Sequence, residues 1–564
     1  MDDLKYAQLL IIFLLASDFL GLQGNFQLLD HCMEIARQNC KHSGFGCSGR
    51  QFEVAKDYRF IGVLVTSIAK MFLGRFSTSR NSLVGLSSSH TGSQGVFARV
   101  ILAGVASWLY APGFAVPTNR PNVLLIMTDQ QSAEMLSCTG NRFVSTPVLD
   151  RLAASGVRFE KAFCANPVCG PSRTAMMTGV MPSRLGIGHN DGVSLPVPEE
   201  ILAHSIGRLF RDAGYEAAYG GKWHSAVKPG ESGFEFISKD ERAGLARDCA
   251  AFLRKSHKRP FLLVASFINP HDICYMGLRY YVQKKNISWP ALINSRLELQ
   301  ELDDALKLPS GVSREEFFSK ICPPLPYNFE IPPGEAEGMW RADNRVYRHY
   351  IRENWNAEQW RLHRWAYSRL TEKVDSEIGQ LLEALRDAGL DENTLVVFTS
   401  DHGEMAGAHR LEHKSVPYEE AIRVPLIISY KGIVQPGLVD HEHLISIGLD
   451  LIPSLLGFVG IPIPSSLPGH SVHLLAQGKA IPWRSYVGIE GGAFRVIRTN
   501  RYKYVIYDSG ERREQLTDLD RDPGEMQNLV AEAEYQPILT QQRQNMREWI
   551  RSKMDSIGAA YIIH

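Results

Sequence analysis

The segment Asn122-Val-Leu-Leu-Ile-Met127, with Asp129 and Gln130 just beyond its end, sets the pattern for the fold. A short and wholly apolar run of this kind is typical of a parallel strand that is buried on both faces. Residues 148–154 then form a predicted helix, because Thr146-Pro147 is a helix start signal. This part of the chain therefore predicts a strand that leads through a polar pair into a helix.

Apolar runs followed by polar residues recur along the chain. Strands are predicted at residues 215–219, 261–267 and 394–399, and helices at 202–213 and in the stretch that ends at Gly389. This alternation predicts an α/β fold, with a large, mostly parallel sheet sandwiched by helices. Ligands of such sheets bind beyond the carboxyl ends of the strands. The polar residues expected to gather at that edge are Asp129, Gln130, Lys222, His224, His271, Asp401 and His402.

The pentapeptide Cys169-Gly-Pro-Ser-Arg173 is the most specific motif in the sequence. On average amino-acid usage, a Cys-x-Pro-Ser-Arg match is expected by chance in well under about one chain in a hundred of this length. Taken alone, Cys169 is equally compatible with a small buried thiol ahead of a helix, with Pro171 in the first turn. The polar residues at the predicted strand ends favour a chemical role instead.

The motif resembles that of the formylglycine-dependent sulfatases, a family of the alkaline-phosphatase-like superfamily. In that family a separate maturase oxidises the cysteine of the motif to an aldehyde, formylglycine. The end of the chain adds to the resemblance, because Arg501-Tyr-Lys-Tyr504 and Asp522-Pro-Gly-Glu525 are similar to a strand and a turn of the family's small C-terminal sheet. The resemblance covers residues 120–554 and implies an alkaline-phosphatase-like fold.

Three regions are predicted along the chain. Residues 1–118 are an unassigned N-terminal extension, residues 119–480 form the sulfatase-like catalytic domain, and residues 481–564 form a small antiparallel sheet with a helix. The last region is recognised by alternating apolar runs separated by turn residues. Its predicted strands are residues 494–499, 502–507 and 514–519, and its predicted helix spans residues 537–554.

The resemblance implies a catalytic role for four residues. Cys169, once it is formylglycine, would be hydrated to a gem-diol, and one hydroxyl of that gem-diol would attack sulfur. Arg173 would hold the gem-diol, and His224 would deprotonate its second hydroxyl so that sulfate leaves and the aldehyde returns. His271 would protonate the leaving oxygen or bind sulfate.

The resemblance also implies a divalent metal ion and sulfate-binding lysines. Carboxylate and amide oxygens suit calcium. Gln130 stands where the commonest pattern has Asp, and His402 where animal sulfatases have Asn, so manganese or another transition ion is the alternative. The implied metal ligands are Asp129, Gln130, Asp401, His402 and the modified Cys169, and the implied sulfate ligands are Lys222, Lys414 and His271.

Three classes of function are compatible with these residues. The favoured one is a sulfuric ester hydrolase that cleaves a sulfate monoester on a sulfated carbohydrate. Because the pair Asp401-His402 also resembles choline sulfatases and phosphonate monoester hydrolases, phosphonate or phosphate monoesters are the rival substrates. A non-catalytic protein that binds anions or glycans is the third class, and it applies if Cys169 is never oxidised. Further candidates for the pocket wall and mouth are His189, Arg184, His409 and the segment 273–333.

Composition limits the partners of the protein. Lys plus Arg and Asp plus Glu both number 61, which gives a formal net charge of zero. This balance argues against general nucleic-acid binding but permits a local anion pocket. The expected partners are a sulfated substrate and the maturase that oxidises Cys169. The 9 cysteines have no metal-ligand or knottin-like spacing, and Cys164 is interpreted as a packing residue.

A signal segment is predicted in the N-terminal extension at about residues 97–115. Arg99 precedes the apolar run 100–110, and small residues follow it. The run is too short for a comfortable transmembrane span. We therefore expect export to the periplasm or the extracellular space, with translation starting near Met71. If the segment is not used, residues 1–118 are a genuine extension and the protein is cytoplasmic.

Overall fold

The computed structural model describes residues 120–287, 296–342, 345–553 and 558–563. The predicted N-terminal extension and its signal segment at about residues 97–115 lie outside the described residues. Within the described part of the chain, no helix combines the length and the apolar character needed to cross a membrane.

An eight-stranded sheet forms the centre of the described region, with the strand order β5-β4-β6-β1-β7-β8-β2-β9. Only β8 in this sheet runs against its neighbours, so the prediction of a large, mostly parallel sheet is confirmed. The strands are β1 (Asn122–Asp129), β2 (Val157–Phe159), β4 (Glu216–Gly221), β5 (Glu235–Ser238), β6 (Phe261–Pro270), β7 (Thr394–Ser400), β8 (Leu426–Ser429) and β9 (Leu438–Asp440).

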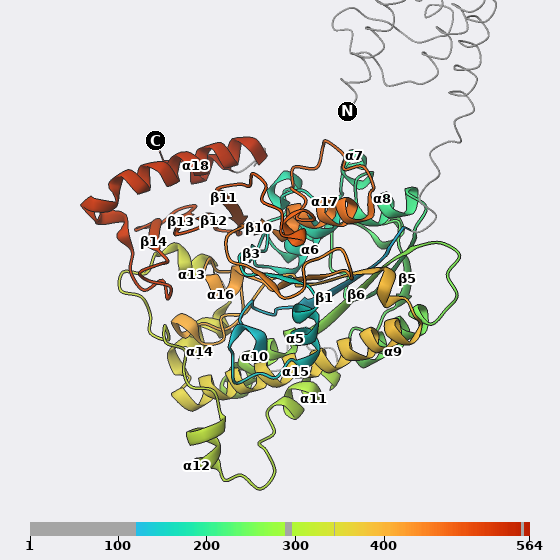
Figure 1. The fold of residues 1–564 in the computed structure, drawn as a ribbon. Coiled ribbons are helices and arrows are strands. Elements are labelled where there is room, and N and C mark those ends of the chain that lie inside the picture. Colours follow the sequence, from blue (N-terminus) through green and yellow to red (C-terminus); the bar gives the residue numbers. More distant parts are fainter. Residues whose placement is uncertain (1–119, 288–295, 343–344, 554–557, 564) are drawn as a thin grey trace, which may run out of the picture. The chain divides into compact units, whose positions relative to one another are not determined.

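Helices cover both faces of this sheet (Figure 1). Successive side chains of a strand point to opposite faces, so each central strand contributes to a core on each side. On β1, Leu124 and Ile126 pack in one core with α5, α9 and α15. Val123 and Leu125 face the other core, which is closed by α6, α8 and α17. The bounds are α5 (Pro147–Ala154), α6 (Cys169–Thr178), α8 (Ile206–Asp212), α9 (Ala243–Leu253), α15 (Ala357–Asp387) and α17 (Ile447–Val459).

The helix predicted at residues 202–213 is interrupted. It is split into α7 (Glu199–Leu202) and α8, with Ser205 in an extended conformation between them. The hydroxyl of Ser205 donates a hydrogen bond of 2.7 Å to the carbonyl of Leu202. A serine side chain that bonds the backbone in this way competes with the helical hydrogen bonds, and periodicity alone does not reveal it.

The insertion 273–333 is described for residues 273–287 and 296–333. Its start, at the end of η5 (His271–Ile273) and in α10 (Cys274–Lys285), reaches the sheet edge with the polar residues through the hydrogen bond of Cys274 to Gln130. The later part packs against α15, where Phe317 and Cys322 contact Trp365. Its remaining helices are α11 (Arg296–Ala305), α12 (Arg314–Glu316) and a short π-helix, η6 (Phe317–Ile321); beyond the insertion follow α13 (Gly338–Ala342) and α14 (Val346–Asn354).

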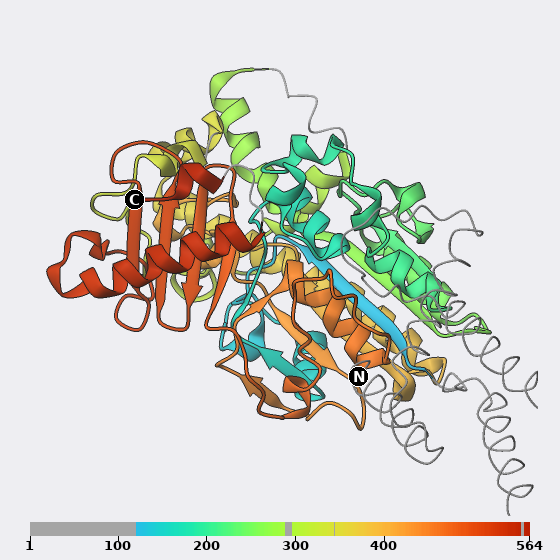
Figure 2. The ribbon, with the colours of Figure 1, turned by 90° about the horizontal axis from the view of Figure 1, so that it is seen from above.

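A four-stranded antiparallel sheet follows near the C-terminus, as predicted, and α18 crosses it (Figure 2). The prediction missed its first strand, which contains Gly488. The sheet shares a core with the main domain, since Ile497 packs in one cluster with Ala175 of α6 and Leu449 of α17. The boundary at residues 480–481 stays a prediction. The elements are β11 (Tyr486–Glu490), β12 (Phe494–Thr499), β13 (Tyr502–Tyr507), β14 (Glu514–Asp518) and α18 (Gln536–Lys553).

The contact between β11 and α18 depends on the absence of a side chain at Gly488. A Cβ atom there would lie 2.1 Å from Cε2 of Trp549. We expect Gly488→Ala to lower the free energy of unfolding by about 1–3 kcal/mol, because overpacking displaces the helix. Chemical denaturation followed by tryptophan fluorescence measures this. Gly230→Ala is the matched control, because a Cβ at Gly230 meets no atom within 4 Å; equal stability losses in both variants would contradict the prediction.

Candidate active site

The tertiary structure brings the predicted site residues together at one edge of the main sheet. Asp129 ends β1, and Asp401 and His402 follow the neighbouring strand β7. Cys169 is the first residue of α6, whose amino end points at the same edge. One ligand atom from each of these four residues lies within 4.8 Å of the others, and all four residues are buried.

Cys169 lies between positively charged and imidazole groups. Its Sγ atom is 3.0 Å from Nζ of Lys414 and 3.2 Å from Nε2 of His402. Burial alone would raise the pKa of the thiol, but the charges of Lys222 and Lys414, with His402 and a hydrogen bond from His224, hold it well below its usual value. The Sγ atom occupies the position that the hydroxyl oxygens of a hydrated aldehyde would take. A negative charge is therefore favoured at this point.

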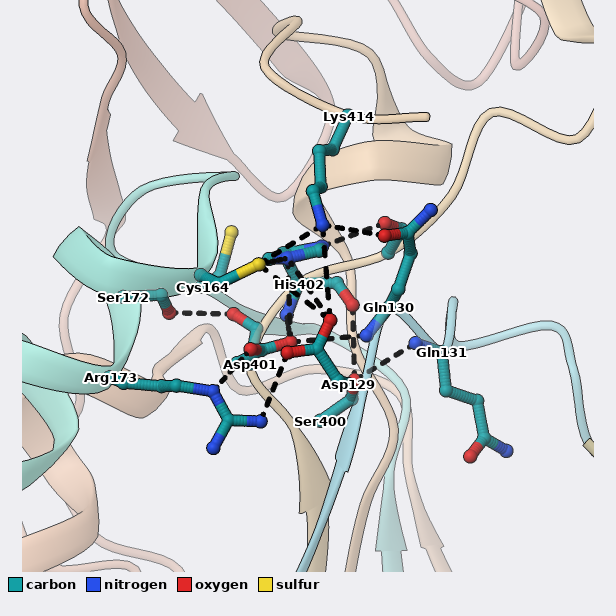
Figure 3. Close-up of polar contacts among 12 residues, drawn as sticks. Asp129, Gln130, Gln131, Cys164, Ser172, Arg173, Ser400, Asp401, His402 and Lys414 are labelled. Carbon is teal, nitrogen blue, oxygen red and sulfur yellow. Dashed lines mark hydrogen bonds and ion pairs between the residues drawn. The ribbon is translucent and has the colours of Figure 1, made fainter. Parts of the chain in front are cut away.

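Arg173 joins the two carboxylates of the site. Its Nε atom is 2.7 Å from Oδ2 of Asp401, and Nη2 is 3.2 Å from Oδ2 of Asp129. Nη1 donates to the carbonyl of Lys222 and to the hydroxyl of Ser266. Figure 3 shows Arg173 and Lys414 approaching the carboxylate pair from opposite sides. In this arrangement the guanidinium positions Asp129 and Asp401; the implied contact of Arg173 with the gem-diol stays a prediction.

The donor set at this edge fits a divalent cation. Asp129 and Asp401 are both fully buried, and burial together with the nearby charge of Asp129 raises the pKa of Asp401. A cation would offset that repulsion. The carbonyl of Gly403 can only accept, so Nδ1 of His402 donates to it at 2.9 Å, and Nε2 is the ring nitrogen that faces the carboxylates. Calcium prefers a ligand set made of oxygen atoms alone. Two carboxylates combined with an imidazole nitrogen also suit manganese.

Two lysines reach the site from different elements, and both are almost completely buried. Nζ of Lys222, just after β4, lies 2.5 Å from Oδ2 of Asp129. Nζ of Lys414 donates to Oε1 of Gln130 at 2.6 Å. Their charges converge on Cys169 and lower the pKa of its thiol, so a negative charge is stabilised there.

The two predicted catalytic histidines flank Cys169. His271 follows β6, and its Nδ1 atom is buried without a hydrogen-bond partner. Burial and the charges of Lys222 and Lys414 lower the pKa of His271 to about 4, so its imidazole is neutral at neutral pH. His224 has a left-handed backbone with a φ of 40°, a conformation that costs energy and is common at functional sites.

The weaker candidates occupy other places. His409 is buried and stacks on the ring of Tyr418 at a centroid distance of 3.9 Å. Arg184 is exposed. His189 is half-buried beside Gly492, where a Cβ atom would lie 1.8 Å from its Nε2. Roles of these three side chains in substrate binding stay predictions.

Sequence reasoning missed several neighbours of the site. Glu404 accepts a hydrogen bond of 2.5 Å from Nε2 of Gln130. Cys274 Sγ donates to the other end of the same amide, Oε1, at 3.0 Å, and His413 contacts that thiol. Glu404 was the easiest to find, since it directly continues the stretch Asp401-His402-Gly403. The others carry no local signal, because they come from helices and loops whose place is decided by packing.

Comparison with known proteins identifies similar families and relatives. The family model described as "Sulfatase" matches residues 121–461, and the model described as "N-sulphoglucosamine sulphohydrolase, C-terminal" matches residues 407–552. A Delta 4,5-hexuronate-2-O-sulfatase of Bacteroides thetaiotaomicron is 29% identical over 77% of this chain and 90% of its own length. An ulvan-active sulfatase of Formosa agariphila is 30% identical over 74% of this chain and 79% of its own length.

Solved structures with the same fold include a 2-O GAG sulfatase with a TM-score of 0.65 and 26% identity, which covers 77% of this chain and 93% of its own. The phosphonate monoester hydrolase of Agrobacterium radiobacter has a TM-score of 0.58 and 20% identity over 78% of this chain and 96% of its own. The second similarity is one of fold alone. Both confirm the alkaline-phosphatase-like architecture expected from the sequence.

Asp401 provides a test of the cation site. Since the pKa of Asp401 is raised in the folded protein, its ionised form is destabilising above its unfolded pKa when no cation is present. We expect Asp401→Asn to keep most of its stability in chelator and to lose the rise in melting temperature that calcium or manganese gives the wild type. Thermal unfolding with and without each cation measures this.

Asp375→Asn is the matched control, because Asp375 is a buried carboxylate that only accepts hydrogen bonds from the backbone of α5. This variant should keep the full response to the cation. An undiminished response in Asp401→Asn would mean that the ion binds elsewhere.

Proposed function

We propose, because this chain belongs to the sulfatase family of sulfuric ester hydrolases, that its substrate is a sulfate monoester carried by a carbohydrate. The observation that carries the proposal is the convergence of Cys169, Lys222, Lys414 and His271 on one buried point. Relatives named for hexuronate and ulvan support a carbohydrate as the leaving alcohol.

Cys169 supplies the nucleophile in this proposal, after a maturase has oxidised it to formylglycine. Water adds to the aldehyde, and one hydroxyl of the resulting gem-diol attacks sulfur while the bond from sulfur to the sugar oxygen breaks. The second hydroxyl then gives its proton to His224, the carbon–oxygen bond to sulfate breaks, and the aldehyde is restored. A serine in the same place would remain trapped as a stable sulfate ester.

Positive charge around Cys169 holds the sulfate group during these steps. Lys222 and Lys414 would contact its oxygens, and the amino end of α6 adds the positive end of a helix dipole. Asp129, Gln130, Asp401 and His402 would hold a divalent cation, calcium or manganese, which supplies further positive charge beside the nucleophile when bound. Arg173 keeps the two carboxylates in place.

His271 is the proposed general acid for the leaving oxygen. Burial and the charges of Lys222 and Lys414 lower its pKa to about 4 in the free protein, and a bound sulfate anion would counter the lysine charges. The pKa of His271 therefore rises upon substrate binding, so that the imidazole can take up a proton and pass it to the sugar oxygen.

A phosphonate or phosphate monoester is the alternative substrate, favoured by the Asp401-His402 pair and by the shared fold with phosphonate monoester hydrolases. Steady-state rates on the sulfate and phosphonate monoesters of one aryl alcohol distinguish the two. A higher kcat/KM on the phosphonate would replace the sulfate proposal. A choline-sulfatase-like activity is tested in the same series with choline sulfate.

Export belongs to the same proposal, since sulfated polysaccharides are encountered outside the cytoplasm. The segment at about residues 97–115 would direct it, with translation starting near Met71. N-terminal sequencing of the mature protein from its native host tests this; an intact start at Met1 would favour a genuine extension and a cytoplasmic enzyme.

The oxidation of Cys169 is testable directly. We expect the peptide that contains Cys169 to carry an aldehyde in active protein from the native host, as seen by mass spectrometry. Cys169→Ala should lose essentially all sulfatase activity, because no nucleophile remains. Cys164→Ala is the matched control, since Cys164 is buried in the hydrophobic core and its Sγ donates a weak hydrogen bond of 4.0 Å to the carbonyl of Ala421; it should stay active. Full activity of Cys169→Ala, or an unmodified thiol in active protein, would exclude this nucleophile.

The role of His271 predicts a dependence on the leaving group. His271→Ala should lower kcat by about 10²- to 10⁴-fold on a sugar sulfate, whose alcohol is a poor leaving group and needs a proton. The loss on 4-nitrophenyl sulfate should be much smaller, because that phenolate leaves without protonation. Equal losses on both substrates would show that His271 binds sulfate and does not act as the acid.

A further inference from the structure

Gln130 makes hydrogen bonds at both ends of its amide group. Its Oε1 accepts from Nζ of Lys414 at 2.6 Å and from Sγ of Cys274 at 3.0 Å. Its Nε2 donates to Oε2 of Glu404 at 2.5 Å. The ammonium group of Lys414 can only donate, so the amide oxygen faces Lys414 and the amide nitrogen faces Glu404. This leaves the amide oxygen directed at Lys414 and the centre of the site.

Glu404 is itself held independently of Gln130. It is 1% exposed, and its Oε1 accepts hydrogen bonds from the backbone N–H groups of Ala406 at 3.1 Å and His413 at 2.6 Å. These bonds also close the loop that ends at Lys414. The backbone hydrogen bonds therefore fix the position of the carboxylate, and the carboxylate in turn orients the Gln130 amide.

The contact with Glu404 also favours an amide at position 130. A carboxylate at that position would bring one of its oxygens about as close to Glu404 as the amide nitrogen is now, 2.5 Å, and would lose the N–H donor. The hydrogen bond between the two side chains therefore requires one donor group and one acceptor group.

We infer that Glu404 is a positioning residue of the cation site: it orients the Gln130 amide so that Oε1 would be available to a bound cation. This rests on the proposed function, because it requires the divalent cation named there. The inference concerns the orientation of a ligand, so it makes a prediction about cation affinity that is independent of turnover.

An exchange of the two functional groups tests the inference. In the double variant Gln130→Glu/Glu404→Gln, the amide nitrogen at position 404 would donate to the carboxylate at position 130. The amide oxygen at 404 would still accept from the N–H groups of Ala406 and His413. The exchange keeps every hydrogen bond and the total charge. Each single variant loses the pairing of one donor with one acceptor between positions 130 and 404.

The experiment measures the Kd of calcium and of manganese for the full-length protein by calorimetry. We expect Gln130→Glu and Glu404→Gln each to weaken cation binding by about 10- to 100-fold, the usual effect of losing an orienting group behind a metal ligand. The double variant should recover most of that loss. Glu412→Gln is the matched control, since Glu412 is a buried glutamate beside His413 with a contact of 3.3 Å; it should bind as the wild type does.

Two outcomes would overturn the inference: Glu404→Gln with unchanged affinity, or a double variant no better than the worse single one. Circular dichroism of each metal-free protein checks folding, and a single variant that fails to fold leaves the recovery in the double variant as the decisive comparison. A wild type that binds neither cation would also overturn it. The proposed function fails separately, if wild-type protein that binds the cation hydrolyses no sulfate ester.

Discussion

The burial of Asp129 and Asp401 side by side is the constraint on which the rest of the site depends. Neither carboxylate has any exposure to solvent, and each raises the energy of the other's ionised form. Arg173 and Lys222 neutralise the pair in the protein itself. In the proposed function, a divalent cation and the sulfate group of the substrate would interact with this charged cluster.

The loop that brings Lys414 to this pair is held in place by arginine and lysine side chains from other segments of the chain. Several of its residues, including His413 and Ser415, have a left-handed backbone that non-glycine residues adopt at a cost. Buried or half-buried side chains donate to its carbonyls: Arg364 to Ala406, Arg352 to His409, Arg348 to Lys414 and Lys503 to Pro417. The ammonium group of Lys414 is therefore positioned before substrate arrives. Lys503 belongs to the C-terminal sheet, so that sheet contributes to the site.

Much of the fold was predictable from local pattern. The apolar runs of β1, β6 and β7 are continuous because these strands are buried on both faces, and the parallel order of the sheet places their carboxyl ends together. Other features were not predictable. The break at Ser205 depends on one side-chain hydrogen bond, and β11 contains Gly488, whose missing side chain makes sense only once Trp549 packs against it.

The sequence by itself determined the chemistry offered at the sheet edge: the Cys169 motif, the acid and imidazole groups after β1 and β7, and the family to which the chain belongs. Tertiary structure alone decided how those groups are oriented and charged. Glu404, Cys274 and His413 reach Gln130 from separate elements, and their contacts arise from packing between segments far apart in the chain. Side-chain direction and local dielectric are collective properties of the packed protein, which no short sequence pattern encodes.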